Sequence, residues 1–286
     1  MININKLPGR TDDTRIIFAG LPFDHNSSFM KGPADAPPKI REALFSSSST
    51  MWSESGIDLG EKGLVVDAGD LGVSVDGAFT AIGKLVNSIL DSGAVPFFLG
   101  GDHSVTWPIF EALNTRVPRI DILHFDAHPD LYDNLDDNRE SHACPFARIM
   151  EKGTVGRLVQ VGIRSTTGHQ IEQAARFGVE TISMQEIHSA DGSISGLKEK
   201  LIFDNPLYIS FDIDALDPAF APGVSHFEPG GLTSRQAISF IQSLSAPSIA
   251  GADIVEYNPD RDRSDVTAYL CAKIFKEIAA RIIAPG

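Results

Sequence analysis

Seven apolar runs, most of them rich in β-branched residues, constrain the fold of this chain more than any other feature. They span residues 16–20, 63–67, 95–101, 120–126, 158–162, 207–212 and 249–256. Runs of this kind without polar alternation are typical of strands covered on both faces, as in parallel sheets. Between them, residues 79–92, 234–243 and about 264–283 carry apolar side chains at helical spacing. Strands that alternate with helices predict an α/β fold with helices on both faces of a mainly parallel sheet.

The 286 residues show no internal repeat and no linker-like break, so we expect a single domain over 1–286, with residues 1–14 loosely ordered. The formal charge of −14, without any basic stretch, argues against nucleic acid or an anionic membrane as partner. No apolar run approaches the roughly 18 residues of a transmembrane helix. The first residues also lack the apolar segment of a secretory signal, and we expect a cytoplasmic protein.

Three of the predicted strands are followed by side chains that commonly bind metal ions. The carboxyl ends of parallel strands meet at one edge of a sheet, where ligand sites form. Within residues 126–130 and 212–214 the polar side chains alternate, so an extended backbone directs them to one side. The set contains four carboxylates and two imidazoles: His103, Asp126, His128, Asp130, Asp212 and Asp214.

The charge of this set predicts how many ions it holds. Four carboxylates and two neutral imidazoles carry −4, which two divalent cations neutralise, whereas one would leave −2 in a cleft. A set rich in carboxylates, with some imidazole and no thiolate, suits Mn²⁺ best, with Fe²⁺, Co²⁺ or Ni²⁺ as substitutes. Two such ions about 3.5–4 Å apart can deprotonate a water molecule at neutral pH. The sequence therefore predicts a centre with two Mn²⁺ per subunit.

A purely structural role for these residues is the competing interpretation. A single Asp-x-His-x-Asp segment often only caps a helix after a strand. Six buried groups of this kind would need many Arg or Lys partners, and few cations lie near these segments in the sequence. Three segments, each after a predicted strand, favour the metal interpretation.

The three segments resemble the signature motifs of the ureohydrolases, the family of arginases, agmatinases and their relatives. They are Gly-Gly-Asp-His-Ser (100–104), Asp-Ala-His-Pro-Asp (126–130) and Ser-Phe-Asp-Ile-Asp-Ala-Leu-Asp-Pro (210–218). The resemblance runs from about residue 16 to the C-terminal helix. It implies an arginase-like three-layer α/β/α sandwich around about eight strands, assembled as homotrimers or homohexamers. Further segments are similar to plant-type arginases in particular: 24–29, 32–43, 141–150 and 251–259.

The resemblance also implies a role for each site residue. His103 would bind one Mn²⁺ and His128 the other, and Asp126 and Asp212 would bridge them. Asp130 and Asp214 would complete the two shells, and Asp130 would in addition pass a proton to the leaving amine. His142, which we expect in an exposed polar loop, stands where the family has a proton-transfer histidine. Glu256 stands where a carboxylate holds the substrate guanidinium; the alternative is a structural carboxylate paired with Arg261 or Arg263.

A guanidinium balances the charge of a hydroxide-loaded cluster, so we expect a cationic guanidine substrate. The similarity to plant-type arginases favours L-arginine, hydrolysed to urea and L-ornithine. Agmatinase activity, giving urea and putrescine, and hydrolysis of another guanidino acid are the alternatives. Tyr132 stands where animal arginases have an asparagine, so the residues that bind the far end of the substrate stay open. A one-zinc deacetylase and a non-catalytic metal-binding homologue are the less favoured interpretations.

Overall fold

The computed structural model describes residues 2, 7, 10–72, 74–190 and 194–284. The segment expected to be loosely ordered, 1–14, therefore lies in part outside the described residues. Within it, the Ile2 amide donates to the Asp70 carbonyl and Thr14 is buried.

The core of the molecule is an eight-stranded sheet in which every pair of neighbouring strands is parallel. The strand order is β2-β1-β3-β8-β7-β4-β5-β6. All seven predicted strands are present. The eighth, β6, has only three residues at the sheet edge and carries no apolar run, so the sequence did not reveal it. The strands are β1 (Ile16–Gly20), β2 (Val65–Asp70), β3 (Val95–Leu99), β4 (Ile120–Phe125), β5 (Val155–Val161), β6 (Glu180–Ile182), β7 (Leu207–Asp212) and β8 (Ile249–Val255).

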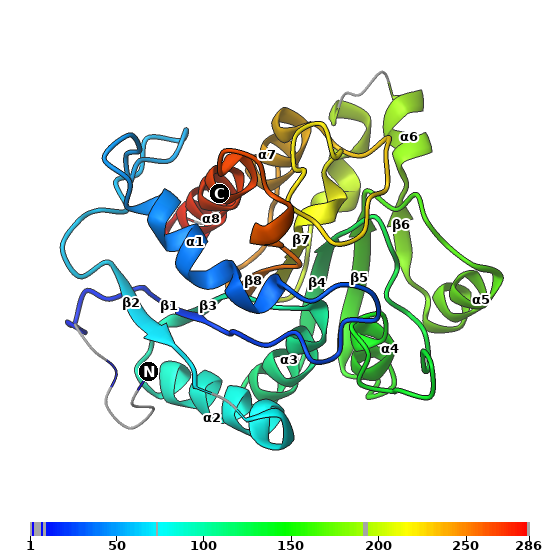
Figure 1. The fold of residues 1–286 in the computed structure, drawn as a ribbon, viewed down its shortest axis with the longest axis horizontal. Helices are drawn as coiled ribbons and strands as arrows, with labels where there is room; N and C mark the ends of the chain where they lie inside the picture. Colours follow the sequence, from blue (N-terminus) through cyan, green and yellow to red (C-terminus); the bar gives the residue numbers. More distant parts are fainter. Residues whose placement is uncertain (1, 3–6, 8–9, 73, 191–193, 285–286) are drawn as a thin grey trace.

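Helices cover both faces of the sheet, which confirms the predicted α/β/α layers (Figure 1). One face is covered by α1 (Ala36–Leu44), α7 (Ser234–Gln242) and α8 (Val266–Ile283). The other is covered by α2 (Ala78–Asp91), α3 (Thr106–Asn114) and α4 (Pro145–Met150). Near the β6 edge lie α5 (Gly168–Phe177) and α6 (Met184–Ser189). Short 3-10 turns are η1 (Pro33–Asp35), η2 (Val75–Gly77), η3 (His103–Val105), η4 (Ser195–Leu201), η5 (Ile213–Ala215) and η6 (Pro259–Arg261).

The strands read as continuous apolar runs because successive side chains enter two different cores. In β1, Ile16 and Phe18 pack under α1 and α8, whereas Ile17 and Ala19 pack under α2 and α3. The second face has an exception near the carboxyl ends of the central strands. There the buried side chains are polar: His124, Gln160, Ser210 and Asp253.

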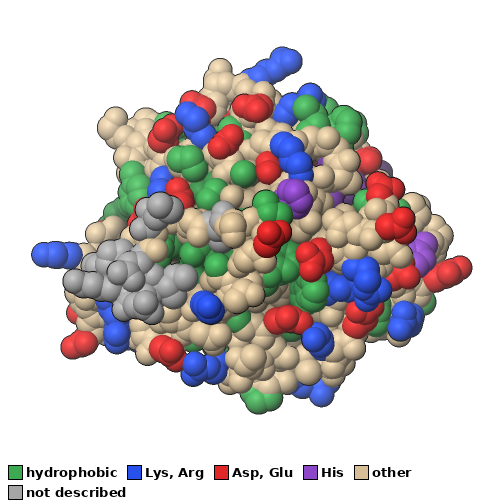
Figure 2. All heavy atoms as spheres, turned by 60° about the horizontal axis from the view of Figure 1, so that its bottom comes forward, with side chains coloured by type: hydrophobic (Ala, Val, Ile, Leu, Met, Phe, Trp, Pro, Cys, Tyr) green, Lys and Arg blue, Asp and Glu red, His purple; other side chains and the backbone are tan. Residues whose placement is uncertain are grey.

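The surface carries charges of both signs. Figure 2 shows acidic and basic side chains interspersed over the visible face, with histidine side chains among them. Among the described residues, no helix combines the length and the apolar character that crossing a membrane requires.

Candidate metal centre

The candidate site lies at the carboxyl ends of the four central strands, in the order β3-β8-β7-β4. His103 begins η3 after β3, Asp126 follows β4 directly, and Asp212 is the last residue of β7. Because the strands are parallel, these ends meet at one edge of the sheet. Contacts of 3.1 to 3.3 Å between imidazole Nδ1 atoms and carboxylate oxygens join all six predicted ligands into one cluster.

His103 is fully buried, and its hydrogen bonds fix which nitrogen carries the proton. The Ser210 hydroxyl lies 2.7 Å from Oδ1 of Asp253, to which it donates. Ser210 Oγ therefore accepts from His103 Nε2, at 2.9 Å. Nδ1 of the neutral ring then presents a lone pair.

The surroundings of that lone pair call for a cation. His103 Nδ1 is buried without a hydrogen-bond partner, yet lies 3.1 to 3.3 Å from oxygens of Asp126, Asp130 and Asp212. A lone pair facing three carboxylates is unfavourable unless a positive charge stands between them. Burial lowers the pKa of His103, but the three carboxylates outweigh burial and raise it well above its ordinary value.

His128 occupies the equivalent place on the other side of Asp126. Its Nδ1 lies 3.3 Å from Oδ1 of Asp126 and 3.2 Å from Oδ2 of Asp214. Burial raises the pKa of Asp212, and the neighbouring charges of Asp214 and Asp126 raise it further. Burial and the charge of Asp126 likewise raise the pKa of Asp214. Without cations these groups could ionise only at a large cost.

The donor set fits two divalent ions. His103 with Asp126, Asp130 and Asp212 could hold one ion, and His128 with Asp126 and Asp214 the other. Asp126 is common to both groups, as expected of a bridging ligand. Asp212, the other predicted bridge, contacts only the His103 imidazole among the described ion pairs. Carboxylate and imidazole donors without thiolate suit Mn²⁺.

Glu256 and His142 form a buried pair next to this cluster. Glu256 follows β8, and its Oε1 accepts from the His103 amide at 2.9 Å and from His142 Nδ1 at 2.8 Å. Its φ of 63° lies in the left-handed region, which is unusual for a residue with a side chain and typical of functional sites. Arg261 and Arg263, the partners that a purely structural role would require, do not pair with it in the described structure.

His142 is buried, whereas the sequence suggested an exposed loop histidine; only 8% of the residue is accessible. Its Nε2 lies 2.8 Å from the hydroxyl of Ser28, which is exposed. The imidazole therefore links Glu256 to the solvent through one hydroxyl group. This geometry suits the exchange of protons between the cluster and the surrounding water.

The ion pair of His142 and Glu256 predicts a pH-dependent stability of the metal-free protein. Burial lowers the pKa of His142, but the Glu256 carboxylate outweighs burial and raises it from 6.5 to about 9. The pair therefore stabilises the fold fully below pH 6.5 and loses this effect as the pH rises to about 9. We expect His142→Asn to lower the free energy of unfolding by roughly 2–3 kcal/mol at pH 6 and by far less above pH 9.

Urea unfolding in the presence of EDTA at several pH values measures this difference. The exposed pair of His169 and Asp133, with nitrogen and oxygen 3.1 Å apart, supplies the control variant His169→Asn. A stability loss for His142→Asn that grows with pH would contradict the pairing.

The sequence interpretation missed other side chains at this site. His124 lies in β4, two residues before Asp126, and so extends the alternating pattern of residues 126–130. It was overlooked because it stands inside an apolar run. His226 packs over the site, with its ring centroid 5.3 Å from that of His142 and 6.1 Å from that of His128. Tyr132 stacks on His169 with centroids 5.7 Å apart.

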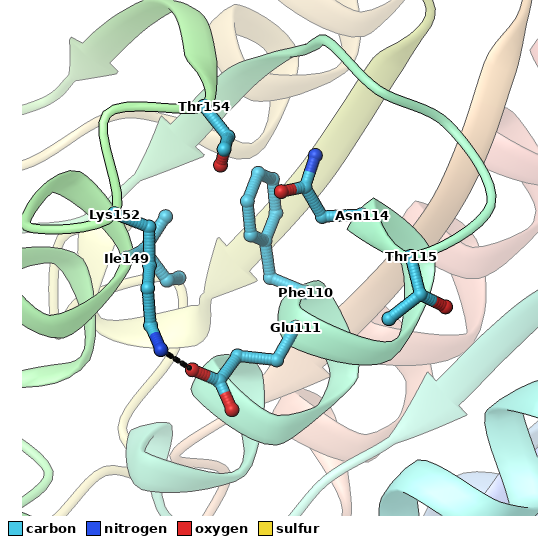
Figure 3. A pocket seen from close by; sticks show the side chains of 7 residues that line it. All are labelled: Phe110, Glu111, Asn114, Thr115, Ile149, Lys152 and Thr154. Atoms are coloured by element: carbon cyan, nitrogen blue, oxygen red, sulfur yellow. Dashed lines mark ion pairs between the residues drawn. The ribbon is translucent and has the colours of Figure 1, made fainter.

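A separate hollow of about 340 Å³ lies between α3 and the segment before β5 (Figure 3). Glu111 and Lys152 form an ion pair of 3.0 Å across it. Asn114 ends α3 before β4 begins, and Thr154 directly precedes β5. This hollow is therefore at the amino ends of the strands, opposite the metal cluster.

Comparison with known proteins gives relatives over most of the chain. The family described as "Arginase family" matches residues 14–280. "Arginase 1, mitochondrial" of Arabidopsis thaliana is 44% identical over 276 residues, covering 92% of this chain and 80% of that protein. "Agmatinase" of Bacillus anthracis is 31% identical over 275 residues, covering 93% and 91%. The solved structure of arginase from Medicago truncatula has a TM-score of 0.87 and 40% identity, covering 94% of this chain and 88% of the other.

The expectation of a cytoplasmic protein is contradicted by these relatives and is wrong. Arginases of Arabidopsis thaliana, Oryza sativa and Medicago truncatula are named mitochondrial. The cytoplasmic expectation rested on the features of a secretory signal and a spanning helix. Mitochondrial targeting depends on neither of them, because it uses amphipathic, Arg-rich segments.

Proposed function

This chain belongs to the arginase family, and we propose that it uses two Mn²⁺ ions to hydrolyse L-arginine to urea and L-ornithine. One observation carries the proposal: two imidazole Nδ1 atoms and four buried carboxylates converge at one edge of the sheet. The similarity to arginases at 44% identity, against 31% for an agmatinase, favours arginine as the substrate.

The residues around the cluster would divide the work as follows. When bound, the two ions would supply a nucleophile by lowering the pKa of a water molecule. Glu256 would hold the guanidinium group by charge, since its carboxylate is buried and stays ionised: His142 and the hydrogen bonds outweigh burial and lower its pKa. Asp130 would accept the remaining proton of the nucleophile and deliver it to the leaving amine, which is too basic to depart without one. His142 would return protons to the solvent through Ser28.

His226 is a candidate for contact with the far end of the substrate. It lies over the cluster, and its ring centroid is 5.6 Å from that of the exposed Phe29. Arginine differs from agmatine in its α-carboxylate, which an imidazole N–H can bind.

The family resemblance also leads us to propose that the chain assembles as a homotrimer or homohexamer. Light scattering, which gives the mass of the assembly in solution, tests this proposal.

The experiment that tests the proposed reaction measures urea release from L-arginine and agmatine in parallel by the Mn²⁺-loaded protein. A higher kcat/KM for L-arginine, with ornithine as the second product, supports an arginase. A preference for agmatine would show that agmatine and not arginine is the substrate, while the reaction would still be hydrolysis of a guanidinium group to urea. The human relative named "Guanidino acid hydrolase, mitochondrial", 32% identical, makes guanidino acids the next substrates to assay. Metal binding without urea from any guanidine would identify a non-catalytic homologue.

A further inference from the structure

We propose that His124 is a positioning residue of the metal centre: it donates a hydrogen bond to the Asp126 carboxylate and binds no ion itself. A hydrogen bond from Gln160 determines which nitrogen of the His124 ring carries the proton. This inference rests on the proposed metal centre. All three side chains are fully buried. The His124 ring stacks on Phe146, with centroids 3.9 Å apart and planes inclined by 27°.

The tautomer follows from the hydrogen bonds of Gln160. Its Nε2 lies 2.7 Å from the carbonyl oxygen of Pro129 and 3.0 Å from Nδ1 of His124. A carbonyl oxygen only accepts, so the amide nitrogen and not the amide oxygen must face Pro129. The second N–H of the same amide then points at His124 Nδ1, which must accept it.

The single ring proton of a neutral His124 is therefore on Nε2. That atom lies 2.8 Å from Oδ2 of Asp126 and donates to it. Oδ1 of the same carboxylate accepts from the His128 amide at 2.6 Å. Each oxygen of Asp126 is thus held by one protein donor, and both keep a lone pair for an ion.

The same bonds distinguish His124 from the ligands. By distance alone, His103, His124 and Asp126 could surround an ion. However, both ring nitrogens of His124 are already occupied, one as acceptor and one as donor. His103 Nδ1, by contrast, is buried without a hydrogen-bond partner. His124 therefore belongs behind the ligands, where it orients the carboxylate that contacts both ligand imidazoles.

Manganese affinity is the test, because it is measured without turnover. Mutation of a residue that hydrogen-bonds a metal ligand typically lowers the affinity for the metal by roughly 10- to 100-fold. We expect His124→Phe, which keeps the stack on Phe146 but loses the donor, to weaken Mn²⁺ binding by this factor. His124→Gln restores an N–H at about the position of Nε2 and should recover most of the affinity. Titration followed by the EPR signal of free Mn²⁺ gives both values.

Gln160→Met tests the second half of the proposal. It removes the donor that fixes the tautomer and should weaken Mn²⁺ binding by roughly 10-fold. The control is Gln173→Met, since Gln173 is equally buried but bonds only Arg176 within α5 among the described contacts. If His124→Phe does not fold, the comparison of these two glutamine variants decides.

The inference is overturned if His124→Phe binds Mn²⁺ as wild type does, or if His124→Gln is as weak as His124→Phe. Loss of one bound ion in both His124 variants would make His124 a ligand and would also overturn it. Wild-type protein that binds no Mn²⁺ would instead refute the proposed function. The two failures are therefore distinguishable.

Discussion

Replacement of Asp126 by asparagine should reduce urea release by roughly a thousandfold or more, the largest effect that we expect. Asp126 is the carboxylate that both ligand imidazoles share, at 3.2 Å from His103 Nδ1 and 3.3 Å from His128 Nδ1. An amide of the same shape has no charge to offset two divalent ions. Without the ions, the pKa of water is no longer lowered toward neutrality, and water is not reactive at neutral pH.

The measurement combines kcat for L-arginine with Mn²⁺ stoichiometry for each variant. A suitable control is Asp121→Asn, because Asp121 is buried in β4, the strand that Asp126 follows, but binds the amides of Arg157 and Asn205 at the opposite end. That variant should lose stability and keep manganese. Retention of more than about a tenth of the activity by Asp126→Asn would contradict its place between two ions.

Substitution of Glu256 by glutamine should lower kcat/KM for L-arginine by roughly 100- to 4,000-fold. Removing one partner of a buried charge pair costs about 3–5 kcal/mol, which corresponds to this factor. The substrate guanidinium would lose its counter-charge, and His142 would lose its own. The amide keeps the size of the side chain, and its oxygen can still accept from the His103 amide.

Glu256→Gln should differ from Asp126→Asn in one decisive respect. Since no Nδ1–carboxylate contact of the cluster involves Glu256, Mn²⁺ binding should stay within a few-fold of wild type. Glu277→Gln is the matched control, because Glu277 is equally buried but pairs with Lys273 on α8, in a different part of the molecule. Parallel loss of manganese and activity in Glu256→Gln would show that Glu256 supports the ions and not the substrate.

The sequence was sufficient to predict the layers of this fold and six residues that meet at its sheet edge. Strands buried on both faces leave continuous apolar runs, and parallel strands place the residues that follow them at a common edge. β6 left no such signal, because Thr181 is exposed and the strand pairs only with β5.

The polar support of the cluster could not be predicted in the same way. Ser210 and Asp253 are in β7 and β8, and their contact depends on a strand order that the sequence does not contain. His142 was expected on an exposed loop, yet it is buried and forms a hydrogen bond with Ser28, which is more than a hundred residues earlier in the chain. Such partners become visible only when the packing of distant segments is known.

A manganese titration of the metal-free protein tests whether this chain works with two metal ions. Turnover of L-arginine and bound Mn²⁺ per chain would be measured at each step. We expect no turnover in EDTA and an increase in turnover that ends at two bound ions per chain. Full activity in EDTA, or a plateau at one ion per chain, would refute a two-metal centre.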